Sequence, residues 1–168
     1  MGETLTGDDS QPGVGGHIPG ASGHPAFSLA KRASSPVPVI VAVPHAGRLY
    51  PQEVLEALRD PRSAALKLED RHADRLADIV CGETGAAKLI CHAPRAMIDL
   101  NRQPDDIDPE MFLRSDRAGL PPASSRGRAR NGLGLIPRRV PGLGELWTRP
   151  MDSAGLHDRL AGIHRPYH

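Results

Sequence analysis

Hydrophobic and polar positions along the chain predict strands and helices that begin only after the first 35 residues. The segment 37–43 (VPVIVAV) is apolar at every position, which is typical of a strand buried on both faces of a sheet. The segments 87–92 (AKLICH) and 96–100 (AMIDL) predict two further strands, and 133–136 (LGLI) could form a short one.

Three segments show the spacing of amphipathic helices. A short helix is predicted over 52–59, a longer one over 63–82, and a last one over 152–164 with Asp152 or Ser153 as its cap. The first five predicted elements therefore follow the order strand, helix, helix, strand, strand. This order predicts an α/β fold with a mixed, mainly parallel sheet flanked by helices.

Composition divides the chain into two parts. Residues 1–35 are rich in Gly, Ser, Pro and Asp and predict a disordered leader, so the folded domain is expected over 36–168. Only 3% of the 168 residues are aromatic, so the core has to be built mainly from aliphatic side chains. The 18 glycines and 17 prolines predict long irregular segments.

Charge and cysteine content exclude several classes of function. The net charge of +1 excludes strong global attraction to nucleic acid or to an anionic membrane. The two cysteines cannot form a four-cysteine zinc site or a disulfide framework. The sequence shows no signal peptide, and its longest apolar run is too short to span a bilayer. A soluble, cytoplasmic protein without a membrane partner is expected.

An arginine-rich segment, 114–139, holds seven arginines against one acidic residue. Such a segment can contact phosphates, and a small nucleic-acid-binding module is one hypothesis. The segment has no interleaved aromatic residues on which bases could stack, and it matches no nucleic-acid-binding motif. A solvated basic loop is therefore favoured, and no nucleic-acid partner is expected.

Candidate chemistry begins where the first predicted strand ends. His45 and Gly47 follow that strand directly, at the edge where open α/β sheets collect ligand-binding residues. An imidazole there could bind a metal or act as a base, or it could be merely structural. The adjacent acids Glu69 and Asp70 could bind a metal, but they could equally form a solvated helix face.

The segment 95–102 (RAMIDLNR) carries the sharpest local signal. Asn101 and Arg102 follow a short apolar stretch and together offer an amide and a guanidinium fork suited to a carboxylate. Arg95 lies six residues before Asn101, at the other end of the same stretch. The alternative is that Asp99 simply forms a salt bridge with one of these arginines.

Five segments carry a common signal: 43–51 (VPHAGRLYP), 68–76 (LEDRHADRL), 95–102 (RAMIDLNR), 132–138 (GLGLIPR) and 165–168 (RPYH). They occur in the order in which the N-formylglutamate amidohydrolase family carries them, so the chain resembles this family over about residues 36–168. The resemblance implies a zinc-exopeptidase-like (phosphorylase/hydrolase-like) α/β fold, as in zinc carboxypeptidases and aspartoacylases. It also implies a metal-dependent amidohydrolase that releases formate and glutamate from the small molecule N-formylglutamate, a late step of histidine catabolism.

The resemblance also implies roles for individual residues. Zinc is the implied cofactor, with His45 as one ligand and either Asp70 or Glu69, with Asp70 favoured, as another. The pair Asn101 and Arg102 is implied to grip the substrate carboxylate, and Arg95 is implied to polarise the scissile carbonyl. A substrate with two carboxylates would also suit a further arginine, for which Arg138 is the candidate.

The sequence departs from the family at its C-terminus. Family members continue past the RPYH segment, and the part that follows supplies a second zinc-binding histidine. The expectation is therefore a fold that is incomplete at its C-terminal end. The alternative hypothesis is a truncated, inactive remnant that binds only a metal or an acidic ligand.

Overall fold

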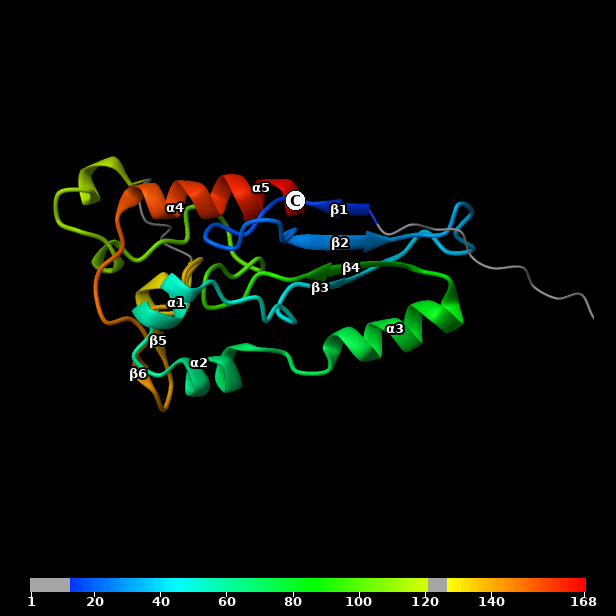
Figure 1. Cartoon of the computed structure of the whole chain (residues 1–168), viewed down its shortest axis with the longest axis horizontal. Coiled ribbons are helices and arrows are strands. Elements are labelled where there is room, and N and C mark those ends of the chain that lie inside the picture. The colour runs from blue at the N-terminus through cyan, green and yellow to red at the C-terminus, as the bar shows by residue number, and fades with distance from the viewer. Residues whose placement is uncertain (1–12, 121–126) are drawn as a thin grey trace, which may run out of the picture.

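A four-stranded mixed sheet forms one half of the protein in the computed structural model, which describes residues 13–120 and 127–168 (Figure 1). The strands are β1 (Gly13–Gly15), β2 (Phe27–Ala30), β3 (Ile40–Val43) and β4 (Ala87–Cys91), in the spatial order β1-β2-β4-β3. Pairing is parallel between β3 and β4, and antiparallel between β1 and β2 and between β2 and β4. The α/β class is confirmed, but the sheet is mixed rather than mainly parallel.

Strands β1 and β2 come from the segment expected to be a disordered leader. Residues 1–12 lie outside the described residues, but from Gly13 onward the structure differs from that expectation. Phe27 of β2 pairs with Cys91 of β4, while Ile18 and Ala26 are fully buried. A few apolar residues spread among glycines are enough to order this segment, because each of them packs onto the remainder of the chain.

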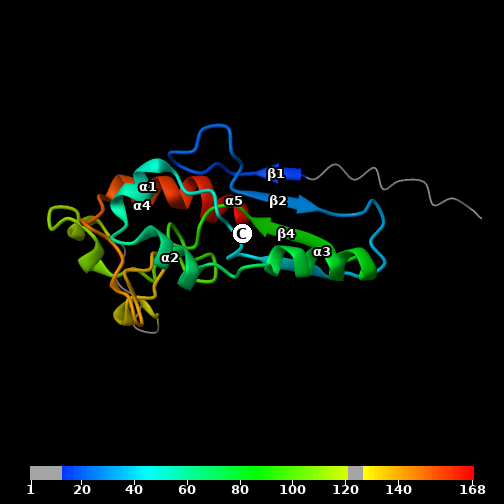
Figure 2. The ribbon, with the colours of Figure 1, turned by 60° about the horizontal axis from the view of Figure 1, so that its bottom comes forward.

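Helix α1 (Gln52–Ala57) lies within the predicted bounds, but the predicted helix over 63–82 is two helices, α2 (Pro61–Leu68) and α3 (Ala73–Thr84). The break comes at His72, which precedes α3 with a φ of 69°, a left-handed conformation that a continuous helix cannot contain. Helix α3 ends at Gly85, where a φ of 73° suits glycine. Figure 2 shows α3 lying along β3 and β4.

The last helix is close to its prediction. Helix α4 (Ser153–Arg159) begins at Asp152, whose side chain accepts a 2.7 Å hydrogen bond from the Gly155 N–H. The chain continues through a widened turn, Leu160–His164, into α5 (Arg165–Tyr167). This helical run lies beside β1 and β2 (Figure 1), and the edge of the Tyr167 ring meets the Phe27 ring at 5.7 Å.

Between β4 and α4 the chain is mostly irregular. Two predicted strands are wrong: 96–100 forms turns, and 133–136 lies outside any strand. Most apolar residues of the two segments are buried in the core and do not form strands. The two segments contact each other, because the Asp99 N–H donates to the Leu135 carbonyl at 2.7 Å. Among the described residues of this stretch, the regular elements are three 3-10 turns (Pro109–Met111, Arg117–Gly119 and Ala129–Asn131) and the strand pair β5 (Arg139–Val140) and β6 (Gly144–Glu145).

The main hydrophobic core joins this irregular segment to α1, α2, α4 and the turn that follows α4, and it includes Cys91 of β4. It includes Phe112, Leu135 and Ile163, all with no exposed surface. The edge strand β3 is largely exposed, with Ile40 at 62%, so the prediction of a strand buried on both faces is wrong. No helix in the described part of the chain is long and apolar enough to cross a membrane.

Candidate active site

The parallel pairing of β3 and β4 brings two segments that carry candidate site residues to the same edge of the sheet. His45 follows β3 by two residues, and 95–102 follows β4. Both segments therefore leave from the carboxyl ends of parallel strands, the common position for ligand-binding residues. Gly47 allows them to approach closely, because a Cβ at this position would collide with the Ala93 carbonyl.

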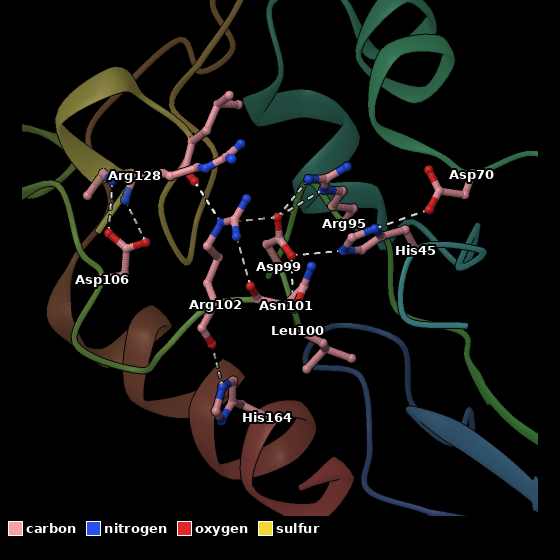
Figure 3. A network of polar contacts seen from close by, with 12 residues as sticks. His45, Asp70, Arg95, Asp99, Leu100, Asn101, Arg102, Asp106, Arg128 and His164 are labelled. Carbon is pink, nitrogen blue, oxygen red and sulfur yellow. Dashed lines mark hydrogen bonds and ion pairs between the residues drawn. The ribbon is translucent and has the colours of Figure 1, made fainter. Parts of the chain in front are cut away.

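His45 is held between two carboxylates (Figure 3). Its Nε2 lies 2.8 Å from Asp99 Oδ1, and its Nδ1 lies 3.2 Å from Asp70 Oδ2. Asp99 is 1% exposed and His45 6%, whereas the Asp70 side chain is 54% exposed. The imidazole is thus anchored by a buried carboxylate on one side and faces an exposed carboxylate on the other.

The break between α2 and α3 puts Asp70 in place. The Asp70 N–H donates to the His45 carbonyl at 3.0 Å, so the two backbones are tied together beside the side-chain contact. The left-handed conformation of His72 then turns the chain into α3. Left-handed conformations of residues other than glycine are uncommon and collect at functional sites.

Glu69, the other acidic candidate, points elsewhere. Its buried carboxylate lies 3.5 Å from Arg71 Nε and 3.9 Å from Arg48 Nε. Burial and the nearby Glu69 carboxylate raise the pKa of Tyr50 above its usual value. Of the two acids, the structure places Asp70 and not Glu69 beside His45.

Asp99 is the centre of the cluster. Arg95 approaches Asp99 Oδ2 with Nε at 3.0 Å and Nη2 at 2.9 Å, and the Asn101 backbone N–H donates to Oδ1 at 2.9 Å. Burial alone would raise the pKa of Asp99, but the hydrogen bond with His45 and the charge of Arg95 outweigh burial and hold this pKa at about 2. Asp99 is therefore ionised at neutral pH.

Arg95 is thus engaged by Asp99, the salt bridge that the sequence left open as an alternative. Arg102 Nε donates to the Leu133 carbonyl at 3.1 Å and Nη1 to the Asn101 carbonyl at 2.9 Å. Arg102 Nη2 makes no hydrogen bond with the described residues, and Asn101 is exposed. The predicted carboxylate-gripping pair therefore keeps donors that a ligand could use.

Two histidines at the C-terminal end of the chain contact the backbone next to Asn101 and Arg102. His164 Nε2 lies 3.2 Å from the Arg102 carbonyl, and His168 Nε2 lies 3.1 Å from the Leu100 carbonyl. Burial lowers the pKa of His164, which favours the neutral ring. The RPYH segment therefore contacts the backbone that carries Asn101 and Arg102.

Arg138 belongs to a different cluster. Its guanidinium contacts Asp108 at 2.7 Å, Glu110 at 3.0 Å and Glu145 at 3.1 Å. Its role in substrate binding stays a prediction, with three carboxylates already occupying its donors. In the same arginine-rich segment, Arg117 donates to the Phe112 carbonyl and Arg139 contacts Glu145, while residues 121–126 lie outside the described part.

Sequence reasoning missed the central position of Asp99. It treated this residue only as a possible salt-bridge partner of an arginine. A signal was present in the segment AMIDL, where one acid stands among apolar residues. A buried carboxylate needs charged or hydrogen-bonding partners, so its burial pointed to a polar cluster.

The cluster suits zinc chemistry with two donors. Two donors on one tetrahedral zinc, each at about 2.0–2.2 Å, lie roughly 3.3 Å apart, and His45 Nδ1 and Asp70 Oδ2 are 3.2 Å apart. A carboxylate that accepts from the other ring nitrogen is the common support of a zinc-binding histidine, and Asp99 has this position. No group of three His, Cys, Asp or Glu suited to a metal occurs among residues 13–120 and 127–168.

Comparisons with known proteins agree on one family. A family model described as N-formylglutamate amidohydrolase matches residues 37–168. The chain is 33% identical over 116 residues to an N-formylglutamate deformylase of Pseudomonas aeruginosa, covering 67% of this chain and 42% of that protein. A crystal structure of an N-formylglutamate amidohydrolase from Ralstonia eutropha matches with a TM-score of 0.71 and 29% identity, covering 85% of this chain and 49% of that one. The chain therefore spans about half the length of these relatives.

Proposed function

The chain belongs to the N-formylglutamate amidohydrolase family, and from this membership we propose that it takes part in hydrolysis of the amide bond of N-formylglutamate to formate and glutamate. The observation that carries the proposal is the position of His45 between the buried Asp99 and the exposed Asp70. This arrangement leaves one ring nitrogen for a ligand and fixes the other. We expect the zinc-exopeptidase-like arrangement of the complete fold on the same grounds.

In this proposal His45 and Asp70 hold zinc, and Asp99 fixes the imidazole so that Nδ1 carries the lone pair. When bound, the metal would act as a Lewis acid on the formyl carbonyl and lower the pKa of water. The described residues supply two donors, and catalytic zinc sites in proteins use three. The zinc affinity of these two donors alone should therefore be modest.

Substrate orientation falls to Asn101 and Arg102. Arg102 Nη2 and the exposed Asn101 amide would grip a carboxylate, and a fixed carboxylate sets the distance and angle of the formyl group. Arg95 contacts Asp99 through Nε and Nη2, and its Nη1 makes no hydrogen bond with the described residues. It would place positive charge near the developing oxyanion while it neutralises Asp99.

Zinc binding tests the metal part of the proposal. The purified chain, stripped of metal, should bind one equivalent of zinc in competition with a chromophoric chelator. His45→Gln should lose this binding, and Asp70→Asn should weaken it at least about tenfold. His157→Gln changes an exposed histidine on α4 and is the matched control. Equal zinc affinity in the His45 and His157 variants would contradict the assignment.

Formate release from N-formylglutamate tests the reaction. The zinc-loaded chain should release formate, and Arg102→Met should raise KM more than it lowers kcat, because it removes binding of the substrate carboxylate. A second candidate function, metal binding without turnover, is favoured by the number of donors. A folded chain that binds zinc through His45 and releases no formate would establish that second function and contradict the first.

A further inference from the structure

A hollow of about 650 Å³ is lined by residues of α1 and α4 among others, and none of the predicted site residues lines it. Its wall is apolar and largely buried, with Val54 from α1, Met111 and Trp147 among the lining side chains. Its rim is exposed and carries three carboxylates, Glu53, Asp152 and Asp158, against one arginine, Arg149, so its net charge is negative.

Arg159 is the unusual residue in this hollow. It is 9% exposed, and its Nη1 donates to the Met97 carbonyl at 3.0 Å. Its Cζ lies 5.6 Å from the centre of the Trp147 ring. Within the described residues no carboxylate lies within 4.0 Å of it, although a buried charge ordinarily has such a partner.

Arg159 lines the hollow, and among the described residues its Nε and Nη2 make no hydrogen bond. The rim acids Asp152 and Glu53 act on the guanidinium through their charge. Burial lowers the pKa of Arg159 to about 10, which still leaves the guanidinium charged at neutral pH.

We propose that this hollow binds a small organic monocarboxylate whose carboxylate pairs with Arg159 and whose apolar body lies against Trp147 and Met111. A guanidinium presents paired N–H donors to a carboxylate, and 650 Å³ is within the range of small-molecule sites. The acidic rim disfavours a second carboxylate. The ligand class therefore differs from the dicarboxylate N-formylglutamate, and the site is separate from the one around His45.

Two sources share this chemistry, a simple carboxylic acid and an α-amino acid with an apolar side chain. The exposed rim carboxylates Glu53, Asp152 and Asp158 would favour a ligand that also carries an ammonium group. Hexanoate and norleucine have the same carbon chain and differ by that ammonium. A comparison of the two distinguishes the sources.

Trp147 provides a direct readout, because it is the only tryptophan of the chain and it lines the hollow. Hexanoate and norleucine should each change the tryptophan fluorescence saturably. The dicarboxylate glutarate should bind at least about threefold more weakly than hexanoate, because of the acidic rim. Hexanol, which has the apolar chain but neither a carboxylate nor an ammonium group, should bind at least about tenfold more weakly than hexanoate.

Arg159→Met should weaken hexanoate binding about tenfold or more. Arg165→Met makes the same chemical change at an exposed arginine outside the hollow and should leave binding unchanged. If Arg159→Met does not fold, Asp158→Asn provides the test, since loss of a rim charge should reduce the preference for hexanoate over glutarate. Absence of a saturable change in the unmodified protein, or equal binding by the Arg159 and Arg165 variants, would overturn the proposal.

Discussion

Two clusters in this protein combine arginine and carboxylate groups, but one has a carboxylate at its centre and the other has an arginine. In the first, Asp99 is the buried centre, and Arg95 and the His45 ring surround it. In the second, Arg138 is the centre, and its side chain is 13% exposed. Three acids surround it, and they are Asp108, Glu110 and Glu145.

The difference lies in what each centre leaves free. Asp99 takes the Nε2 side of His45 and thereby directs Nδ1 toward the exposed Asp70, so the first cluster can bind a ligand. Arg138 has donors on three carboxylates and ties the turn 109–111 to the pair β5 and β6. The first cluster is therefore expected to serve chemistry as well as stability, and the second to serve the fold alone.

The largest expected effect follows from the loss of the first centre. Asp99→Ala leaves Arg95 without its carboxylate and the His45 N–H without an acceptor, and we expect a loss of about 3 kcal/mol in the free energy of unfolding. Asp99→Asn keeps the shape and should lower zinc affinity about tenfold or more. Urea unfolding and chelator competition measure the two effects. An Asp99→Asn variant with unchanged zinc affinity would make the first cluster structural, like the second.

The second largest expected effect is a loss of free energy of unfolding when the first cluster is exposed to acid. The folded pKa of Asp99 is about 2, below the ordinary 3.8, so its stabilising contribution is complete above the ordinary value and is lost as pH falls toward 2. The loss should amount to about 2 kcal/mol between about pH 5 and about pH 2. Urea unfolding across this range measures it, with Asp99→Asn as the reference. Parallel pH profiles of the two proteins would show that Asp99 carries no such linkage.

Loss of the second centre should cost less. Arg138→Met leaves Asp108, Glu110 and Glu145 close together, but the last two are partly exposed and can be hydrated. We expect a loss of about 1–2 kcal/mol in the free energy of unfolding, with unchanged zinc affinity. If formate release is measurable, KM should also stay unchanged. A rise in KM at constant kcat would instead support the predicted contact of Arg138 with a substrate carboxylate.

The contrast between the clusters also explains what the sequence could predict. His45 was a candidate because it follows a predicted strand, but its contact with Asp70 was not predictable from pattern, because the helix predicted over 63–82 lacked the break before α3. The contacts of Arg138 with Asp108, Glu110 and Glu145 were not predictable, because they join irregular segments that show no periodic pattern. Burial of 96–100 was visible as an apolar run, but its form, turns and not a strand, is decided by contacts such as Asp99 with Leu135.

Residues 13–35 show a second case in which local composition did not predict the structure. Glycine and serine content predicted disorder there, yet Phe27 and Ile18 pack onto elements that come much later in the chain. Strand β2 pairs with β4 some 60 residues on, and local composition carries no sign of such a partner. The α/β class was predictable because β3 and β4 are strongly apolar, whereas the antiparallel half of the sheet was not.

The smallest expected effect is at the edge of the second cluster. Arg139 also contacts Glu145, but its side chain is 55% exposed and the pair is surrounded by water. Exposed pairs gain little because both ions are well hydrated when apart and salt screens their attraction. Arg139→Met should therefore leave the thermal midpoint within error of the unmodified protein, at low and at high salt. A decrease as large as that of Arg138→Met would mean that Glu145, and not Arg138, is the centre of the second cluster. The contrast with Asp99 would then be between two carboxylates, one buried and one exposed.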